Sequence, residues 1–173
     1  MAATFIWYQD YGAGPTSYSG VANVNWKNSD VPTDVYSTYP ITAGNNSYSI
    51  WQYGRFQGSF NQILNGLWAH TAGVLGTGLT LKGAPTGASQ LTYSTPSTAT
   101  LSGLTVDMTT VSGIAQGTVV YFGATGPNTG GKTASATANP CFTNYLTTQL
   151  QTTVAASAGD TATVTVTLQY DEN

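Results

Sequence analysis

Residues 126–133 (GPNTGGKT) form a stretch whose residue types and spacing match a chemical motif, the phosphate-binding loop G-x-x-x-x-G-K-[ST]. In such a loop, backbone amides at the start of a helix hold phosphate, and Lys132 and Thr133 would contact phosphate and Mg²⁺. Here residues 134–140 (ASATANP) lack an amphipathic helical pattern and soon reach a proline, and no apolar strand ending in Asp follows to hold the metal. We therefore interpret the stretch as a glycine-rich surface turn.

Other candidate catalytic and metal-binding groups are few. His70 is the single histidine and Cys141 the single cysteine, so the two predict neither a zinc site nor an internal disulfide. A nucleophile–His–acid triad would have to use His70, but the chain has no G-x-S-x-G motif. The carboxylates are Asp10, Asp30, Asp34, Asp107, Asp160, Asp171 and Glu172. Most of them lie in loops, in a turn or at the chain end, which disfavours the paired carboxylates of a glycosidase. We expect no enzyme activity, no cofactor and no metal, with a loop Ca²⁺ site as a weaker alternative.

Aromatic residues are the remaining candidates for binding. Tryptophan and tyrosine rings stack on sugar faces, and the rings available for such a platform are Trp7, Tyr8, Tyr11, Trp26, Trp51, Tyr53 and Trp68. Several of them lie in strand-like runs, where packing in the core is the commoner fate. The same residue types also anchor protein interfaces. We expect core or interface roles, and the candidate interface residues are Phe5, Ile6, Trp7, Tyr8 and Tyr11.

The segments that must position these residues read as strands. Residues 163–170 alternate apolar and polar side chains, which puts Val164, Val166, Leu168 and Tyr170 on one face. Further strands are expected at 4–8, 21–26, 49–60, 79–81 and 119–122, and at 67–70 after a hairpin turn at Asn65 and Gly66. Paired threonines favour a long strand over a helix at 143–156, with a short helix as the alternative. Residues 61–65 are a candidate for one helical turn.

Turn signals recur every 8–15 residues, a spacing typical of a sandwich or jelly roll. We predict an all-β protein, a single-domain antiparallel β-sandwich of jelly-roll type over residues 19–173, with a loop-rich region around 83–118. Residues 1–18 are aromatic and then rich in glycine and proline, which suggests an N-terminal arm that docks on a partner or on a sister subunit. The alternative is that residues 4–8 form the first strand of the core.

Composition excludes several classes of protein. The 173 residues include only 4 basic and 7 acidic side chains, 6% charged, with a net charge of −3. Without a basic patch, we expect no nucleic-acid partner. No apolar run approaches the ~20 residues that cross a bilayer, so no membrane partner is expected either. The start of the chain lacks the basic and apolar regions of a signal peptide. A surface of Thr, Ser, Asn, Gln and Gly suits a subunit of a large assembly, and a neutral secreted β-domain is the alternative.

Two regions carry a resemblance to a known group. The first runs through 44–56 (GNNSYSIWQYGRF), 58–63 (GSFNQI) and 67–68 (LW), and the second through 147–150 (TTQL), 158–160 (AGD) and 167–172 (TLQYDE). Together they cover about a third of the chain and resemble segments of small virion structural proteins of tailed phages.

The resemblance implies a β-rich, non-enzymatic part of a phage particle, in particular a capsid decoration (cement) protein. Such a protein is made in the host cytoplasm and placed on the capsid surface of the virion. Its partners would be the major capsid protein and further copies of itself, with a trimer favoured. A tail, neck or fibre component is the first alternative. A carbohydrate-binding or adhesive β-domain is the alternative from another class.

Overall fold

The computed structural model describes residues 2–21, 23–84, 91–109, 113–128, 135–157, 159 and 163–173, with backbone alone at 113–119 and 135–136. Its strands are β1 (Ala3–Tyr11), β2 (Thr16–Ser19), β3 (Ile50–Gly58), β4 (Ile63–His70), β5 (Leu79–Gly83), β6 (Val106–Asp107), β7 (Gly113–Val119), β8 (Phe122–Gly123), β9 (Ser135–Ala136), β10 (Cys141–Thr143), β11 (Leu146–Thr152) and β12 (Val166–Glu172). No helix occurs within the described ranges.

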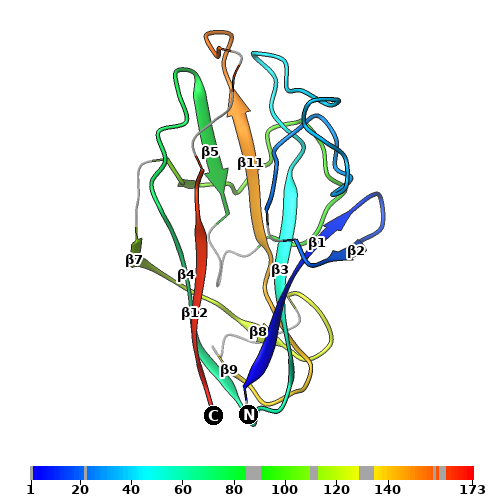
Figure 1. Cartoon of the computed structure of the whole chain (residues 1–173), viewed down its shortest axis with the longest axis vertical. Helices are drawn as coiled ribbons and strands as arrows, with labels where there is room; N and C mark the ends of the chain where they lie inside the picture. Colours follow the sequence, from blue (N-terminus) through cyan, green and yellow to red (C-terminus); the bar gives the residue numbers. More distant parts are fainter. Residues whose placement is uncertain are drawn as a thin grey trace.

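The strands form two antiparallel sheets. Sheet A has the order β2-β1-β3-β11-β5-β6, with β10 pairing β3 and β8 pairing β10, and sheet B has the order β12-β4-β7, with β9 pairing β4. Figure 1 shows β1, β3, β11 and β12 running along the long axis, with both chain ends at one end of the molecule. The predicted all-β antiparallel sandwich is confirmed; the jelly-roll connectivity stays a prediction.

The main core lies between the two sheets and follows from the two-residue period of the strands. Phe56 and Leu146 of sheet A meet Ile63 and Trp68 of sheet B in one buried cluster. The stacked rings of Trp7 and Trp68 have centroids 5.2 Å apart. Edge strand β12 contributes Val166, Leu168 and Tyr170 to the same cluster, which is the face that its alternation predicts.

A second layer of side chains covers the opposite face of sheet A. Trp51, Tyr53 and Tyr145 form a buried aromatic cluster there. Leu91, Tyr93 and Leu101, from the segment between β5 and β6, pack against it. Part of the region predicted to be rich in loops therefore covers the sheet.

Several local expectations are wrong, and the strand expected at 119–122 is interrupted at residues 120–121, between β7 and β8. Residues 21 and 23–26, expected as a strand, are irregular, and residues 61–62 form no helical turn. Asn65 and Gly66 lie inside β4, where they coincide with an irregular register against β12, instead of forming a hairpin turn. Gly66 suits this position because a Cβ there would meet the Phe122 ring at 2.6 Å and Val120 at 2.8 Å.

The beginning of the chain is a strand of sheet A, which was the alternative to an arm. Strand β1 pairs with β3 from Ala3 to Asp10 and with β2 from Tyr8 to Tyr11. The amide of Ala3 donates to the Glu172 carboxylate at 2.8 Å, so the first strand is also linked to the last one. Docking of this segment on another protein stays a prediction.

Candidate functional site

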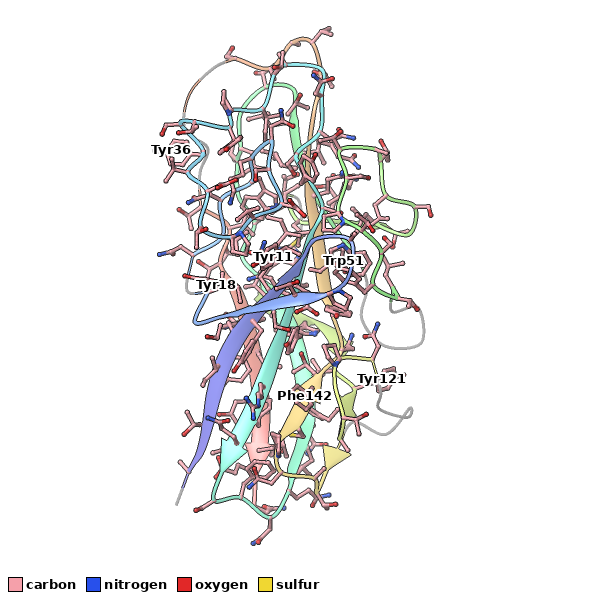
Figure 2. The ribbon with its side chains drawn as sticks, turned by 90° about the vertical axis from the view of Figure 1, so that its right-hand side faces the viewer. Tyr11, Tyr18, Tyr36, Trp51, Tyr121 and Phe142 are labelled. Atoms are coloured by element: carbon pink, nitrogen blue, oxygen red, sulfur yellow. The ribbon has the colours of Figure 1, made fainter. Side chains whose placement is uncertain are left out.

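The candidate site is the outer surface of sheet A near β10, formed by Ile6, Tyr8, Tyr53, Arg55 and Phe142 and called the Tyr8–Arg55 surface below. Strand pairing brings these residues together: Ile6 lies opposite Arg55, Tyr8 opposite Tyr53, and Phe142 of β10 opposite Arg55. Paired residues share a face of the sheet, so side chains from three strands gather on one surface. Figure 2 shows Phe142 on β10 beside β3.

The rings on this surface are ordered by contact with one another. Tyr8 and Tyr53 stack with centroids 5.2 Å apart and an interplanar angle of 12°. Phe142 lies 6.2 Å from Tyr53 in a tilted arrangement. Tyr53 is buried beneath its neighbours, whereas Tyr8 and Phe142 are half-buried. The rings therefore form an ordered aromatic surface on which Tyr8 and Phe142 remain partly exposed to solvent.

Arg55 supplies the positive charge of the surface. Its guanidinium donates to the Tyr8 hydroxyl at 3.3 Å and lies over the Phe142 ring at 5.8 Å from the centroid. Its Nε is buried and has no hydrogen-bond partner. Among the described residues no carboxylate lies within ion-pair distance of Arg55, and the ion pair of Lys82 with Asp107 joins β5 to β6. A half-buried, unpaired guanidinium on an aromatic surface is suited to a partner's carboxylate or carbonyl oxygen.

A buried hydrogen-bond network supports the Tyr8–Arg55 surface from one side. Asp10, 3% exposed, accepts from the Tyr145 hydroxyl at 2.5 Å and from the Ser17 hydroxyl at 2.6 Å. The Tyr53 hydroxyl donates to Ser17 at 3.1 Å. Burial raises the pKa of both Tyr53 and Tyr145, which keeps their hydroxyls protonated as donors. The network ties β1, β2 and β3 to Tyr145, which lies between β10 and β11, and it holds Tyr53 beneath Tyr8.

The five candidate interface residues are divided between two faces of β1. Ile6 and Tyr8 lie on the Tyr8–Arg55 surface, whereas Phe5 and Trp7 point into the core between the sheets. Tyr11 is half-buried at the end of β1, opposite Thr16. The sequence pattern names Tyr53 among the rings with a core or interface role, but it does not indicate Arg55 or Phe142 as part of this surface. The alternation in 49–60 puts Trp51, Tyr53 and Arg55 on one face, but no local signal indicates that β10 pairs with β3.

The sequence also named His70 and Cys141, and the structure buries both of them. His70 is buried, with Nδ1 3.1 Å from the Thr71 carbonyl oxygen. Cys141 is fully buried, and burial raises its pKa to about 11, which keeps the thiol unreactive at neutral pH. No cluster of three or more His, Cys, Asp or Glu side chains suited to a metal occurs in the described ranges. Asp160 and residues 129–133 of the glycine-rich stretch lie outside them.

The tryptophans do not form an exposed row. Trp51 and Trp68 are 0% and 4% exposed and belong to different clusters, as core packing predicts. Trp26 is half-buried and donates from Nε1 to the Thr148 hydroxyl at 3.2 Å.

A groove of about 1070 Å³ lies beside Trp26, and its lining includes Leu146 and Leu150 of β11, Asn25 and Tyr36 of the 21–43 segment, and Val164 and Val166 near the start of β12. None of its described lining residues is charged.

The comparisons with known proteins identify no relative. No family model, no curated protein sequence and no solved structure matches the chain. In the described residues, no helix has the length and apolar character needed to cross a membrane.

Proposed function

We propose that the protein is a non-enzymatic structural protein of a virion, a capsid decoration protein that binds the major capsid protein and copies of itself. The observation that carries the proposal is the Tyr8–Arg55 surface. Tyrosine and arginine are the residue types that dominate binding energy at protein interfaces, and here they lie preordered on a rigid sheet. Half-buried rings and an unneutralised guanidinium favour a protein partner over a small substrate.

The segments that resemble virion proteins support the same proposal. Residues 44–56 lead into β3 and include Tyr53 and Arg55 of the surface. Residues 147–150 belong to β11, and residues 167–172 belong to β12. The resemblance therefore includes the strand that carries the centre of the candidate site.

The physical role of a decoration protein agrees with this construction. A subunit that binds only the assembled shell stabilises that shell by mass action, to an extent set by its concentration relative to its dissociation constant. Such a subunit needs a scaffold that does not deform and a contact surface whose burial against the shell lowers the free energy of binding. The sandwich provides the scaffold, and the Tyr8–Arg55 surface provides the contact.

The test compares two single-cation variants, R55M and K82M. The ligand is a shell assembled from the major capsid protein encoded in the same genome. Each variant removes one positive charge and keeps a long side chain, but Lys82 lies on β5, away from the surface, in an ion pair with Asp107. We expect R55M to weaken shell binding at least tenfold, the loss that about 1.4 kcal/mol represents, and K82M to bind like the native protein. Shells that the native protein neither binds nor stabilises against heat would contradict the proposal. Rings or tubes formed by the native protein alone would favour a tail or neck component.

The neutral groove favours a second candidate function, binding of an uncharged carbohydrate. The half-buried Trp26 and the amide of Asn25 are the kinds of groups that stack on and hydrogen-bond to sugars. In a binding assay on immobilised neutral polysaccharides, this candidate predicts retention of the native protein, loss in W26A and in N25A, and no change in R55M. Absence of retention on every polysaccharide would exclude it for that panel.

A further inference from the structure

We propose that β12 is the strand through which two copies of this protein pair, so that their B sheets join into one continuous antiparallel sheet about a two-fold axis at Leu168. The proposal rests on the proposed structural function, because it names a contact by which copies of the protein associate. It concerns a sheet edge distant in sequence and in pairing from the Tyr8–Arg55 surface.

No described strand covers the outer edge of β12. Within the described residues, β12 pairs with β4 on one side and with no strand on the other. The Thr165 carbonyl accepts from the Thr71 amide at 2.9 Å, and the Asn173 amide donates to the Gln62 carbonyl at 3.0 Å. Residues with odd numbers therefore direct their backbone groups toward β4 at both ends of the strand.

This alternation continues through the middle of β12. Between Gln169 and Asp171 the strand advances two residues while β4 advances three, so the irregularity lies in β4. In an antiparallel pair, alternate residues direct their N–H and C=O groups to opposite edges. The N–H and C=O groups of Val166, Leu168 and Tyr170 thus point to the open edge, where a further strand can pair with all six.

The composition of the edge does not protect it from pairing. Natural edge strands carry charged side chains, proline or bulges, and these features prevent association with another strand. Residues 163–170 contain no charge, no proline and no glycine, and the acidic residues come only at 171 and 172. Val166, Leu168 and Tyr170 pack on the core but remain half-buried, so part of their apolar surface is left for a partner to cover.

The edge is complementary to itself. With Leu168 opposite its own copy, Val166 lies opposite Tyr170, Thr167 opposite Gln169, and Asp171 opposite Thr165. An apolar side chain then meets an aromatic ring, and each carboxylate of Asp171 meets a hydroxyl. A register centred at Tyr170 would shorten the overlap and bring the acidic ends of the two copies together. The pairing at Leu168 satisfies the open-edge N–H and C=O groups of Val166, Leu168 and Tyr170 in both copies and places Glu172 opposite Val164, which is why we assign a second copy as the partner.

The charge variants T167K/Q169E and T167K/Q169K test this register. Both alter the same two exposed, outward positions of β12, so their effects on the isolated fold are matched. In the proposed register, residue 167 of one copy opposes residue 169 of the other in the non-hydrogen-bonded pairs, where side chains lie closest. T167K/Q169E creates two Lys–Glu pairs across the contact, and T167K/Q169K creates two Lys–Lys pairs.

Sedimentation of the protein alone, over a concentration series at low salt, measures the association. We expect the native protein to associate reversibly. The dissociation constant of T167K/Q169E should be about tenfold lower than that of T167K/Q169K, because each cross-strand pair changes association by a few-fold. High salt should reduce this difference. Thermal melting of both variants at high dilution checks that the two monomers are equally stable.

Two results would overturn the proposal. One is a native protein that stays monomeric up to its solubility limit, and the other is equal association of the two charge variants. A monomer whose shell binding is weakened by T167K/Q169K would identify a strand of the capsid protein as the occupant instead. Because no shell is present in the sedimentation experiment, a failure of self-pairing is separate from a failure of shell binding in the R55M comparison.

Discussion

At the scale of single residues, close contacts on the inner face of sheet A decide which side chains the chain tolerates. Gly54 of β3 lies opposite Trp7 and beneath the ring of Phe5. A Cβ at this position would overlap the Phe5 ring and meet a Thr143 methyl group at 3.2 Å. Glycine therefore lets β1 and β10 pack closely against β3.

We expect G54A to destabilise the protein by about 1–3 kcal/mol, the usual cost of overpacking a core. The matched control is G14A, since a Cβ at Gly14 would meet nothing within 4 Å. Chemical unfolding followed by tryptophan fluorescence measures both. Equal stabilities of G54A and G14A would show that the Phe5 ring moves aside without cost.

The buried carboxylate of Asp10 is the second residue-scale feature with a measurable consequence. It accepts hydrogen bonds from Ser17 of β2 and from Tyr145, which lies just before β11. In D10N, an NH2 group replaces one acceptor oxygen and faces a hydroxyl donor, so we expect the free energy of unfolding to fall by about 1–3 kcal/mol. D171N is the control, because Asp171 is exposed and holds only Asn65, at 2.7 Å. An unfolding midpoint of D10N as high as that of D171N would contradict a structural role for the network.

At the scale of strands, the two-residue alternation of apolar and polar side chains predicts strands that have one face on the core between the sheets. Strands β3, β5, β11 and β12 were predicted because their apolar positions repeat every second residue or their threonine pairs favour extended backbone. The sequence of 21–26 alternates just as clearly, yet residues 21 and 23–26 line the groove as irregular chain. Alternation reports a preference for extended backbone, and only tertiary pairing decides whether a neighbouring strand is present.

The candidate site was predictable to a smaller extent, for a related reason. The sequence predicts the aromatic run of β1, but successive side chains of a strand point to opposite faces. The run is therefore divided between the core and the Tyr8–Arg55 surface. Arg55 and Phe142 join the surface through pairing between β3 and β10, which are separated by more than 80 positions. Such pairing depends on the register of the whole sheet and leaves no local pattern.

Neighbouring residues of β1 should differ sharply in their contribution to stability. Trp7 stacks on Trp68 in the core, so W7A should cost at least about 2 kcal/mol, below the full range for buried tryptophan because Trp7 is half-buried. Ile6 lies on the outer face, and I6T should stay within about 1 kcal/mol. Unfolding of both variants in denaturant tests the assignment of faces. Equal losses would mean that β1 does not separate core from surface.

At the scale of the whole molecule, few ionic contacts and many buried hydroxyl groups determine how stability depends on pH. Only 11 of the 173 residues carry full charges. Tyrosines in the cluster on sheet A have raised pKa values: burial is the largest cause for Tyr53, Tyr93 and Tyr145, and the charge of Asp10 adds to it. We therefore expect the alkaline side to be the sensitive one.

The pKa of Tyr93 sets the pH range of this sensitivity, because burial raises that pKa to about 12 from the ordinary 10.0. A raised pKa in the folded state means that the folded protein holds the proton more tightly than the unfolded chain. The contribution of the protonated Tyr93 hydroxyl to the free energy of unfolding is complete below pH 10 and is lost as the pH rises toward 12.

The midpoint of urea unfolding should accordingly fall steeply above pH 10, and Y93F should reduce the slope. Because Y93F also removes the hydrogen bond to the Gly12 carbonyl, the slopes and not the absolute midpoints are compared. Y36F is the control, since Tyr36 is 51% exposed and should leave the slope unchanged. Identical slopes for Y93F, Y36F and the native protein would show that the cluster opens to solvent before its tyrosines ionise.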